Sequence, residues 1–108
     1  MNMTEQVRAS HILLMYAGSM RSSNDRSKED ALQLIEELKS AVEEGEDFSE
    51  LAKTHSDCPS GTEGGDLGSF GRGQMVPEFE ESAFSMEVGD TSGVVETDFG
   101  YHLIRRTG

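Results

Sequence analysis

The sequence has few of the residues that cross-link a chain covalently or anchor it in a membrane. Among its 108 residues there is one cysteine, Cys58, so no internal disulfide can form and the fold cannot depend on an oxidising compartment. The longest apolar run, at residues 12–15, is far shorter than a membrane span. Residues 1–6 are polar and lack the apolar segment of a secretion signal. We therefore expect a cytoplasmic protein without a membrane partner.

Positive charge is also scarce. The chain has nine Lys and Arg residues against 21 Asp and Glu residues, which gives a net charge of −12. A protein that binds DNA or RNA needs basic side chains to neutralise phosphates, so this balance argues against a nucleic-acid partner. The length fits one domain. We place it at residues 7–108, after a short extension at residues 1–6, and expect it to be a monomer.

The clearest pattern in the chain is one amphipathic helix. Ser27 is followed three residues later by Asp30, a pair that is typical of a helix start. Apolar residues then recur at helical spacing up to Val42, and Gly45 is placed to end the helix. The sequence therefore predicts a helix of roughly four turns between Ser27 and Gly45.

The other predicted elements are shorter. Asp47 with Glu50 indicates the start of a second helix, and Pro77 suits the first turn of a third. Alternating apolar residues predict strands at residues 7–16, 66–70, 92–97 and 101–106. A tight turn joins the last two strands, so we expect an antiparallel sheet and an α+β fold.

Cys58 lies at the start of a glycine-dense segment that runs to Phe70. Glycine lets the backbone adopt positive φ and approach other groups closely, and Leu67 and Phe70 argue against a solvated linker. An inert apolar role and a functional thiol explain a lone cysteine equally well here. His55 precedes it by three residues and is better explained as a solvated or core-edge histidine. CxxC and HxxxH pairs are absent, so we expect no zinc site.

Two further histidines occupy the middle of predicted strands. His11 shares a strand face with Ala9 and Leu13, and His102 shares one with Ile104. A buried imidazole is costly without a hydrogen-bond partner. Two imidazoles on facing strands satisfy each other, one donating and one accepting. A lone strand histidine is usually structural, but a pair near a thiol leaves the structural and functional interpretations evenly balanced.

Apolar residues gather around the third helix and the glycine-dense segment. They are Leu67, Met75, Phe79 and Phe84. Plain core packing explains some of them, and a shallow pocket for a small apolar ring is the alternative. The segment Gly71-Arg72-Gly73 is too short for a phosphate loop, and no Lys-Ser or Lys-Thr follows Gly64-Gly65, so no nucleotide cofactor is expected.

The chain carries a series of separated short motifs from its first strand to its last. They are Ala9-Ser10-His11-Ile12-Leu13, Phe48-Ser49-Glu50-Leu51-Ala52, Ser56-Asp57-Cys58-Pro59-Ser60, Gly64-Gly65-Asp66-Leu67-Gly68, Gly71-Arg72-Gly73-Gln74-Met75, Pro77-Glu78-Phe79-Glu80 and Thr97-Asp98-Phe99-Gly100-Tyr101-His102. Together they resemble the parvulin-type peptidyl-prolyl cis/trans isomerases over residues 7–107. The resemblance implies a four-stranded antiparallel sheet surrounded by helices, as in parvulins and FKBP-like proteins. It also implies noncovalent rotation about X–Pro bonds in proline-containing peptide segments of client proteins, without a cofactor or metal.

The resemblance assigns roles to eight residues. The catalytic set is His11, Cys58, His102 and Thr97. The proline pocket is Leu67, Met75, Phe79 and Phe99. Relatives carry Cys or Asp at the position of Cys58, and a carboxylate is a poor substitute for a thiol that attacks an amide. We therefore expect Cys58 to act through its polarity and position, not as a nucleophile.

A preference for the residue before proline is a separate question. Pin-type members recognise phosphoserine or phosphothreonine through a basic cluster in the loop after the first strand. Arg21 falls at one position of that cluster and Arg26 lies nearby, so both are candidate anion-binding residues. Met15 and Met20 occupy positions where the cluster has basic residues. This pattern argues against strict phosphate dependence, and solvated loop charges are the simpler explanation of the two arginines.

Two alternatives to an isomerase use the same residues. One is a proline-peptide-binding or chaperone module that uses the groove with little turnover. The other is a cysteine-dependent hydrolase or redox protein with a Cys58–His dyad. The retention of His11, Cys58 and His102 together with the apolar pocket residues favours the isomerase.

Overall fold

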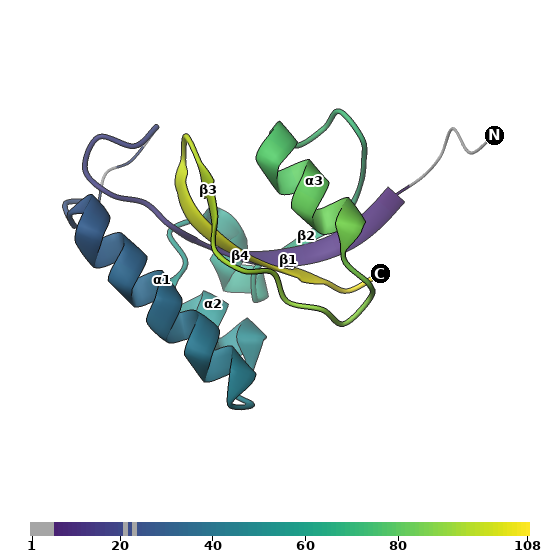
Figure 1. Ribbon diagram of the computed structural model, residues 1–108, viewed down its shortest axis with the longest axis horizontal. Coiled ribbons are helices and arrows are strands. Elements are labelled where there is room, and N and C mark those ends of the chain that lie inside the picture. The colour runs from purple at the N-terminus through teal and green to yellow at the C-terminus, as the bar shows by residue number, and fades with distance from the viewer. Residues whose placement is uncertain (1–5, 21, 23) are drawn as a thin grey trace.

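The computed structural model describes residues 6–20, 22 and 24–108, which form a four-stranded antiparallel sheet with helices on both faces (Figure 1). The strands are β1 (Gln6–Leu14), β2 (Asp66–Gly71), β3 (Val95–Thr97) and β4 (Gly100–Arg106). The helices are α1 (Lys28–Glu43), α2 (Phe48–His55), the 3-10 helix η1 (Pro59–Glu63) and α3 (Pro77–Ser85). This architecture confirms the predicted α+β class.

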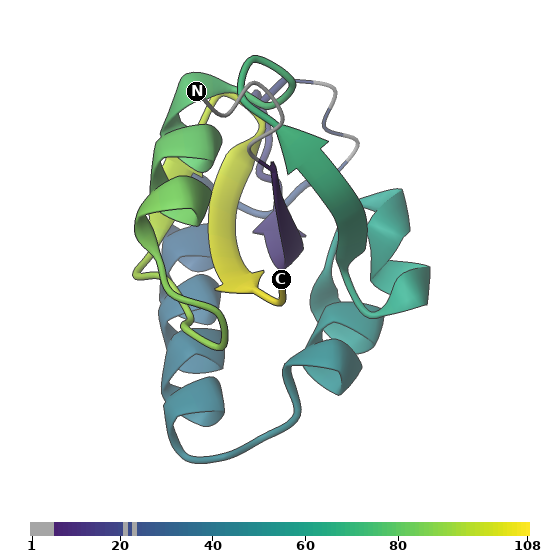
Figure 2. The ribbon, with the colours of Figure 1, turned by 90° about the vertical axis from the view of Figure 1, so that its right-hand side faces the viewer.

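The strand order is β2-β1-β4-β3, so the first and last strands of the sequence are neighbours at the centre of the sheet. Figure 2 shows β2, β1 and β4 side by side. His11 of β1 pairs with Ile104 of β4, and Leu13 pairs with His102. This register brings the two strand histidines, which are 91 positions apart in the sequence, next to each other.

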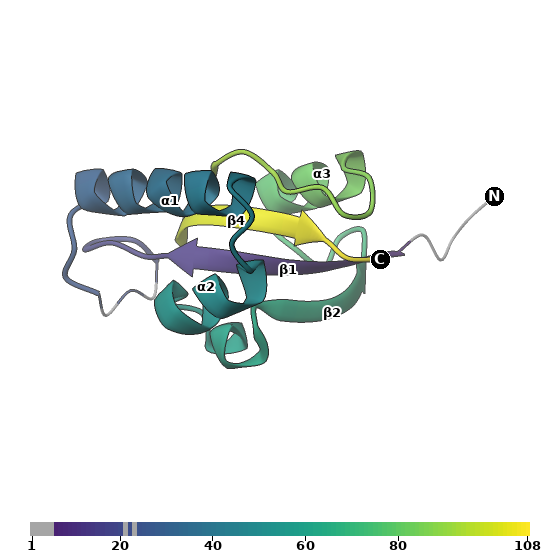
Figure 3. The same cartoon turned by 90° about the horizontal axis from the view of Figure 1, so that it is seen from below.

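The helices divide between the two faces of the sheet. In Figure 1, α1 and α2 lie on one face of the sheet and α3 lies on the other, and the view from below in Figure 3 shows α1 and α2 on either side of β1. Alternate residues of β1 point to opposite faces. Ile12 and Leu14 pack in the core under α1 and α2, whereas Val7 and Ala9 pack with residues of α3. The predicted alternation along β1 is confirmed.

The helix boundaries follow local signals. The Ser27 side chain accepts a hydrogen bond from the amide of Asp30, as the capping pattern predicts. The α1 helix ends at Glu43, and Gly45 takes a φ of +102° just beyond it. Asp47 is the N-cap of α2, as predicted, and its side chain accepts a hydrogen bond from the amide of Ser49. Pro77 opens α3 as predicted.

Three segments differ from the predicted pattern. The strand β1 ends at Leu14, because the amide of Met15 donates to the side chain of Asp57 and leaves the sheet. The helix η1 occupies part of the glycine-dense segment, where no helix was predicted. Of the strand predicted at residues 92–97, only Val95–Thr97 forms a ladder. Ser92 binds Ile104 in another way, because its amide donates to the carbonyl of Ile104 and its hydroxyl oxygen accepts the amide of Ile104.

Candidate active site

The two strand histidines are directly bonded. The Nδ1 atoms of His11 and His102 lie 3.1 Å apart, and the two residues are only 5% and 4% exposed. Burial lowers the pKa of His11 to about 4. Burial, with a smaller effect of His11, lowers the pKa of His102 to about 3. Both rings are therefore neutral near pH 7, and one Nδ1–H donates to the other Nδ1.

Thr97 extends this pair into a chain of hydrogen bonds. Its Oγ1 lies 2.7 Å from Nε2 of His102 and accepts the amide N–H of Phe99 at 3.2 Å. His102 is thus bonded at both ring nitrogens. Nε2 of His11 is buried and has no hydrogen-bond partner among the described residues. It is the free end of the chain of hydrogen bonds from Phe99 through Thr97 and His102.

The proton positions along this chain have two consistent arrangements. In one, the Thr97 hydroxyl donates to His102, whose Nδ1–H donates to His11, so Nε2 of His11 carries a proton. In the other, Nδ1–H of His11 donates to His102, and Nε2–H of His102 donates to Thr97. Nε2 of His11 then carries a lone pair. Both arrangements keep the pair uncharged.

A pocket of about 480 Å³ opens beside the histidines on the α3 face of the sheet. Its lining comes from both central strands, the segments around η1 and β2, the loop before α3, and α3 itself. The lining residues are His11, Leu13, Met15, Cys58, Pro59, Leu67, Gln74, Met75, Val76, Phe79, Phe99 and His102. Phe79 stands edge-on to both imidazoles, with ring centroids 5.5 Å from His11 and 5.6 Å from His102.

The structure brings the predicted catalytic and proline-pocket residues together. Of these eight residues, seven line this pocket, and Thr97 lies behind His102 and bonds to it. The roles assigned to them remain predictions. Five further lining residues had no predicted role in the pocket: Leu13, Met15, Pro59, Gln74 and Val76. Leu13 was identifiable, because it shares the strand face of His11, but no periodicity indicates which loop residues enter a pocket.

The glycine-dense segment places β2 against the histidine strand. The carbonyl of Gly65 accepts the amide of His11 at 2.9 Å. Gly65 has a φ of +85°, and a Cβ there would collide with the carbonyl oxygen of His11. Only glycine lets the chain turn at this distance. Leu67, two residues later, then reaches the wall of the pocket.

Of the two candidate anion-binding arginines, the structure describes Arg26, which already has internal partners. The guanidinium of Arg26 lies 2.6 Å from the Asp57 carboxylate and also donates to the carbonyl of Met15 at 3.0 Å. A substrate anion would compete with these internal partners. Arg21 lies outside the described residues.

The part of the chain that the structure describes contains no group of three or more His, Cys, Asp or Glu side chains placed to hold a metal ion. Within the same part, no helix has the length and apolar character needed to cross a membrane.

Comparisons with known proteins agree with the resemblance seen in the motifs. The PPIC-type PPIase domain family matches residues 1–108. The peptidyl-prolyl cis-trans isomerase Pin1 of Digitalis lanata is 43% identical over 116 residues, which cover 97% of this chain and 98% of the relative. Pin1 of Arabidopsis thaliana is 45% identical, with 95% and 96% coverage. The structure of the peptidyl-prolyl isomerase ESS1 from Candida albicans superposes with a TM-score of 0.91 at 39% identity, over 99% of this chain and 65% of that one. The chain therefore belongs to the PPIC-type peptidyl-prolyl cis-trans isomerase family.

Proposed function

We propose that this isomerase holds the ring of a substrate proline between Leu67, Met75 and Phe79 and rotates the preceding carbonyl beside Cys58 and the His11–His102 pair. One observation carries the proposal. A single pocket of about 480 Å³ joins an apolar wall that fits a pyrrolidine ring to a polar edge made of a thiol and two imidazoles. The substrate is a proline-containing peptide segment, such as an exposed X–Pro bond in a folding chain.

Rotation about an amide bond needs no group transfer. The barrier of about 18–20 kcal/mol arises because the resonance of the planar amide is lost when the bond twists. The two isomers of an X–Pro bond are close in energy but exchange slowly. A catalyst therefore needs only to bind the twisted amide better than either planar form. An apolar pocket that anchors the proline ring and excludes water, while the carbonyl turns against polar groups, meets this requirement.

The histidine pair suits a positioning role. Both rings are neutral, buried and bonded to each other, and Thr97 fixes His102 from behind. Phe79 contacts both rings at its edge, so the proline wall and the imidazoles form one packed unit. A rigid, uncharged pair of this kind presents fixed dipoles to a rotating carbonyl without exchanging a proton with it.

Cys58 is partly exposed at the pocket and precedes η1. We assign it a noncovalent role in the electrostatic environment of the carbonyl. The test is a protease-coupled assay of an X–Pro peptide. The wild-type chain should accelerate the exchange, and Cys58→Asp should retain most of that acceleration. A covalent adduct trapped on Cys58 during turnover would contradict the noncovalent role. Peptide binding without any acceleration would instead support the binding-module alternative.

The residue before proline is expected to matter without a strict requirement for phosphate. Met15 lines the pocket with an apolar side chain, and Arg26 is already paired with Asp57. The same assay with Glu, phosphoserine, Arg and Leu before proline measures this preference. A preference for Glu and phosphoserine that Arg21→Ala abolishes would establish an anion site.

The net charge of −12 and the lone cysteine support a cytoplasmic monomer, and sedimentation analysis tests its oligomeric state.

A further inference from the structure

The end of β1 has an edge that β2 does not cover. The pairing of β1 with β2 ends at Ser10 and Asp66, and His11 is bonded to Gly65. Leu13 and Met15 lie beyond this point, and their amide groups need other partners, since unpaired buried backbone groups are costly.

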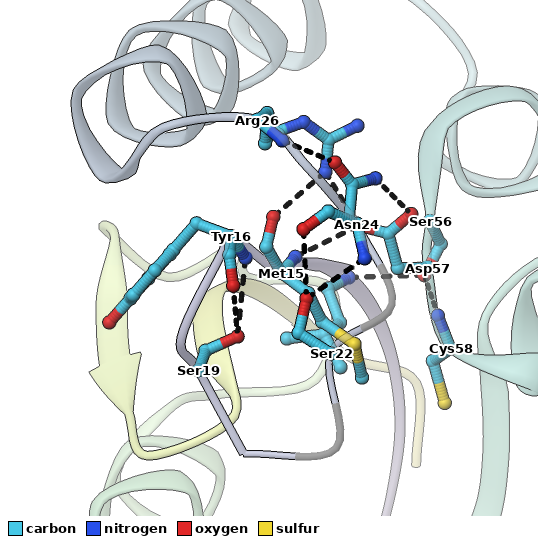
Figure 4. Close-up of polar contacts among 10 residues, drawn as sticks. Met15, Tyr16, Ser19, Ser22, Asn24, Arg26, Ser56, Asp57 and Cys58 are labelled. Atoms are coloured by element: carbon cyan, nitrogen blue, oxygen red, sulfur yellow. Dashed lines mark hydrogen bonds and ion pairs between the residues drawn. The ribbon is translucent and has the colours of Figure 1, made fainter.

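The segment Ser56–Cys58 runs along this edge and forms hydrogen bonds with its backbone groups (Figure 4). The amide of Leu13 donates to the Ser56 hydroxyl oxygen at 3.1 Å, and the carbonyl of Leu13 accepts the amide of Asp57 at 2.7 Å. The amide of Met15 donates to the Asp57 carboxylate at 2.8 Å. The residues just before the thiol are therefore bonded to the strand that carries His11.

The Asp57 carboxylate is the centre of this network. Besides the amide of Met15, it binds the guanidinium of Arg26 at 2.6 Å and the side-chain amide of Asn24 at 3.3 Å. Arg26 also donates to the carbonyl of Met15. Figure 4 shows that Arg26 and Asp57 together hold the peptide groups on both sides of Met15. The two charged side chains are only 23% and 21% exposed, so solvent screens this pair less than it screens a surface ion pair.

The network links two residues that line the proline pocket. Met15 follows the end of β1, and Cys58 follows Asp57 directly, although Met15 and Asp57 are 42 positions apart in the sequence. Through its carboxylate and its own amide, Asp57 sets the position of both lining residues relative to His11. A displacement of this segment would change the width of the polar edge of the pocket without removing any group that faces the substrate.

We propose that Asp57, with Arg26 as its bound cation, is a positioning residue of the isomerase site that holds Met15 and Cys58 in register with the histidine pair. This inference rests on the proposed function of the pocket. It assigns Arg26 an internal role in place of contact with a substrate anion.

The experiment compares Asp57→Asn, Arg26→Gln and Arg26→Lys in the protease-coupled assay with a peptide that has Leu before proline. Misplacement of catalytic groups by about 1 Å is enough to cost about a hundredfold in rate, so kcat/KM should fall by at least about tenfold in Asp57→Asn and Arg26→Gln. The loss should lie mainly in kcat, because the proline wall itself is unchanged. Arg26→Lys keeps the charge and should recover part of the rate.

A second measurement reports the position of the thiol itself. Cys58 is the sole cysteine, so the rate of its alkylation by iodoacetamide is an unambiguous signal. We expect this rate to change severalfold in Asp57→Asn and Arg26→Gln and to return toward the wild-type value in Arg26→Lys.

The matched control is Arg8→Gln. It removes an Arg–Asp pair of the same composition, Arg8 with Asp66, which is more exposed and does not line the pocket. Both readouts should stay within about twofold of wild type in this control, since exposed pairs contribute little.

The outcomes separate the inference from the function it rests on. A wild-type chain without isomerase activity would overturn the proposed function. An active wild type with unchanged kcat/KM and unchanged alkylation in folded Asp57→Asn and Arg26→Gln would overturn the positioning role alone. If Asp57→Asn does not fold, which circular dichroism reveals, Arg26→Gln and Arg26→Lys decide the question.

Discussion

On the face of the sheet that α1 and α2 cover, the core is apolar and closed, whereas on the α3 face it contains buried histidines and opens into a pocket. We call these the closed face and the pocket face. Ile12, Leu14, Ile35 and Leu103 are fully buried on the closed face. On the pocket face the nine-residue helix α3 packs Phe79 and Phe84 against Phe70 of β2. This packing leaves the histidine pair at the wall of the pocket.

This difference shows how one sheet supports both stability and function. Two helices over one face bury enough apolar surface to hold the fold. The other face can then keep costly features: a cavity, a thiol, and two imidazoles that must find partners in a dry environment. Substitutions on the closed face should therefore lower mainly stability, and substitutions at the pocket wall should lower mainly activity.

The largest expected effect on stability is on the closed face. Ile35→Ala removes a fully buried side chain and leaves a cavity, so the free energy of unfolding should fall by about 2–5 kcal/mol. Urea unfolding measures this loss. At a temperature where the variant is still folded, its kcat/KM should match wild type. A large loss of activity in the folded variant would show that the two faces are not independent.

The pocket face should make stability depend on pH. Burial lowers the pKa of both histidines, to about 4 for His11 and about 3 for His102. As the pH falls below about 6.5, the unfolded chain binds protons at these residues and the folded chain does not. Above this pH the two histidines are neutral in both states and do not lower the free energy of unfolding. Between pH 7.5 and pH 5 the free energy of unfolding should fall by an amount on the order of 2–4 kcal/mol for the pair.

Urea unfolding at a series of pH values between 7.5 and 5 checks this slope. The matched control is His55→Gln, which removes the third histidine of the chain, outside the pocket. The slope should persist in this variant. A flat profile in wild type, or a slope that disappears in His55→Gln, would contradict the assignment to the buried pair.

The smallest of the three effects on stability belongs to the pocket wall. Met75→Ala shortens a partly buried side chain that faces the proposed proline site. We expect kcat/KM to fall by about tenfold, while the free energy of unfolding changes by less than about 1 kcal/mol. The comparison variant is Leu32→Ala, which shortens an exposed apolar side chain on α1 and should change neither quantity. Equal activity in the two variants would remove Met75 from the proline wall.

Local signals in the sequence predicted much of the fold. Ser27 and Gly45 marked the ends of α1, and alternation along the strands assigned His11 and His102 to their faces. The motifs identified the family, which the comparisons confirmed. The residues predicted for the proline pocket lie around one cavity. The caps and the alternation depend on a few neighbouring residues or on a short repeat, whereas the pocket residues were predicted from the family resemblance.

The network around Asp57 was not predictable in the same way. In the sequence Asp57 is an acidic residue beside a cysteine, and Arg26 is a charge in a polar loop. Their pairing exists because the chain after α2 runs along the exposed edge of β1. Met15 was assigned to a strand, and its place in the pocket wall follows from the same contact. Loop conformations of this kind carry no periodic signal.

By itself, the sequence determined the elements, the residue types at the site and the apolar faces, because helix caps, glycine positions and period-two alternation act over a few residues. The tertiary structure alone decided that β1 and β4 are neighbours, that the two imidazoles meet at 3.1 Å, and that Arg26 binds Asp57 inside the protein. These features depend on strand order and on contacts between distant segments, where burial and the need to pair every polar group select one arrangement.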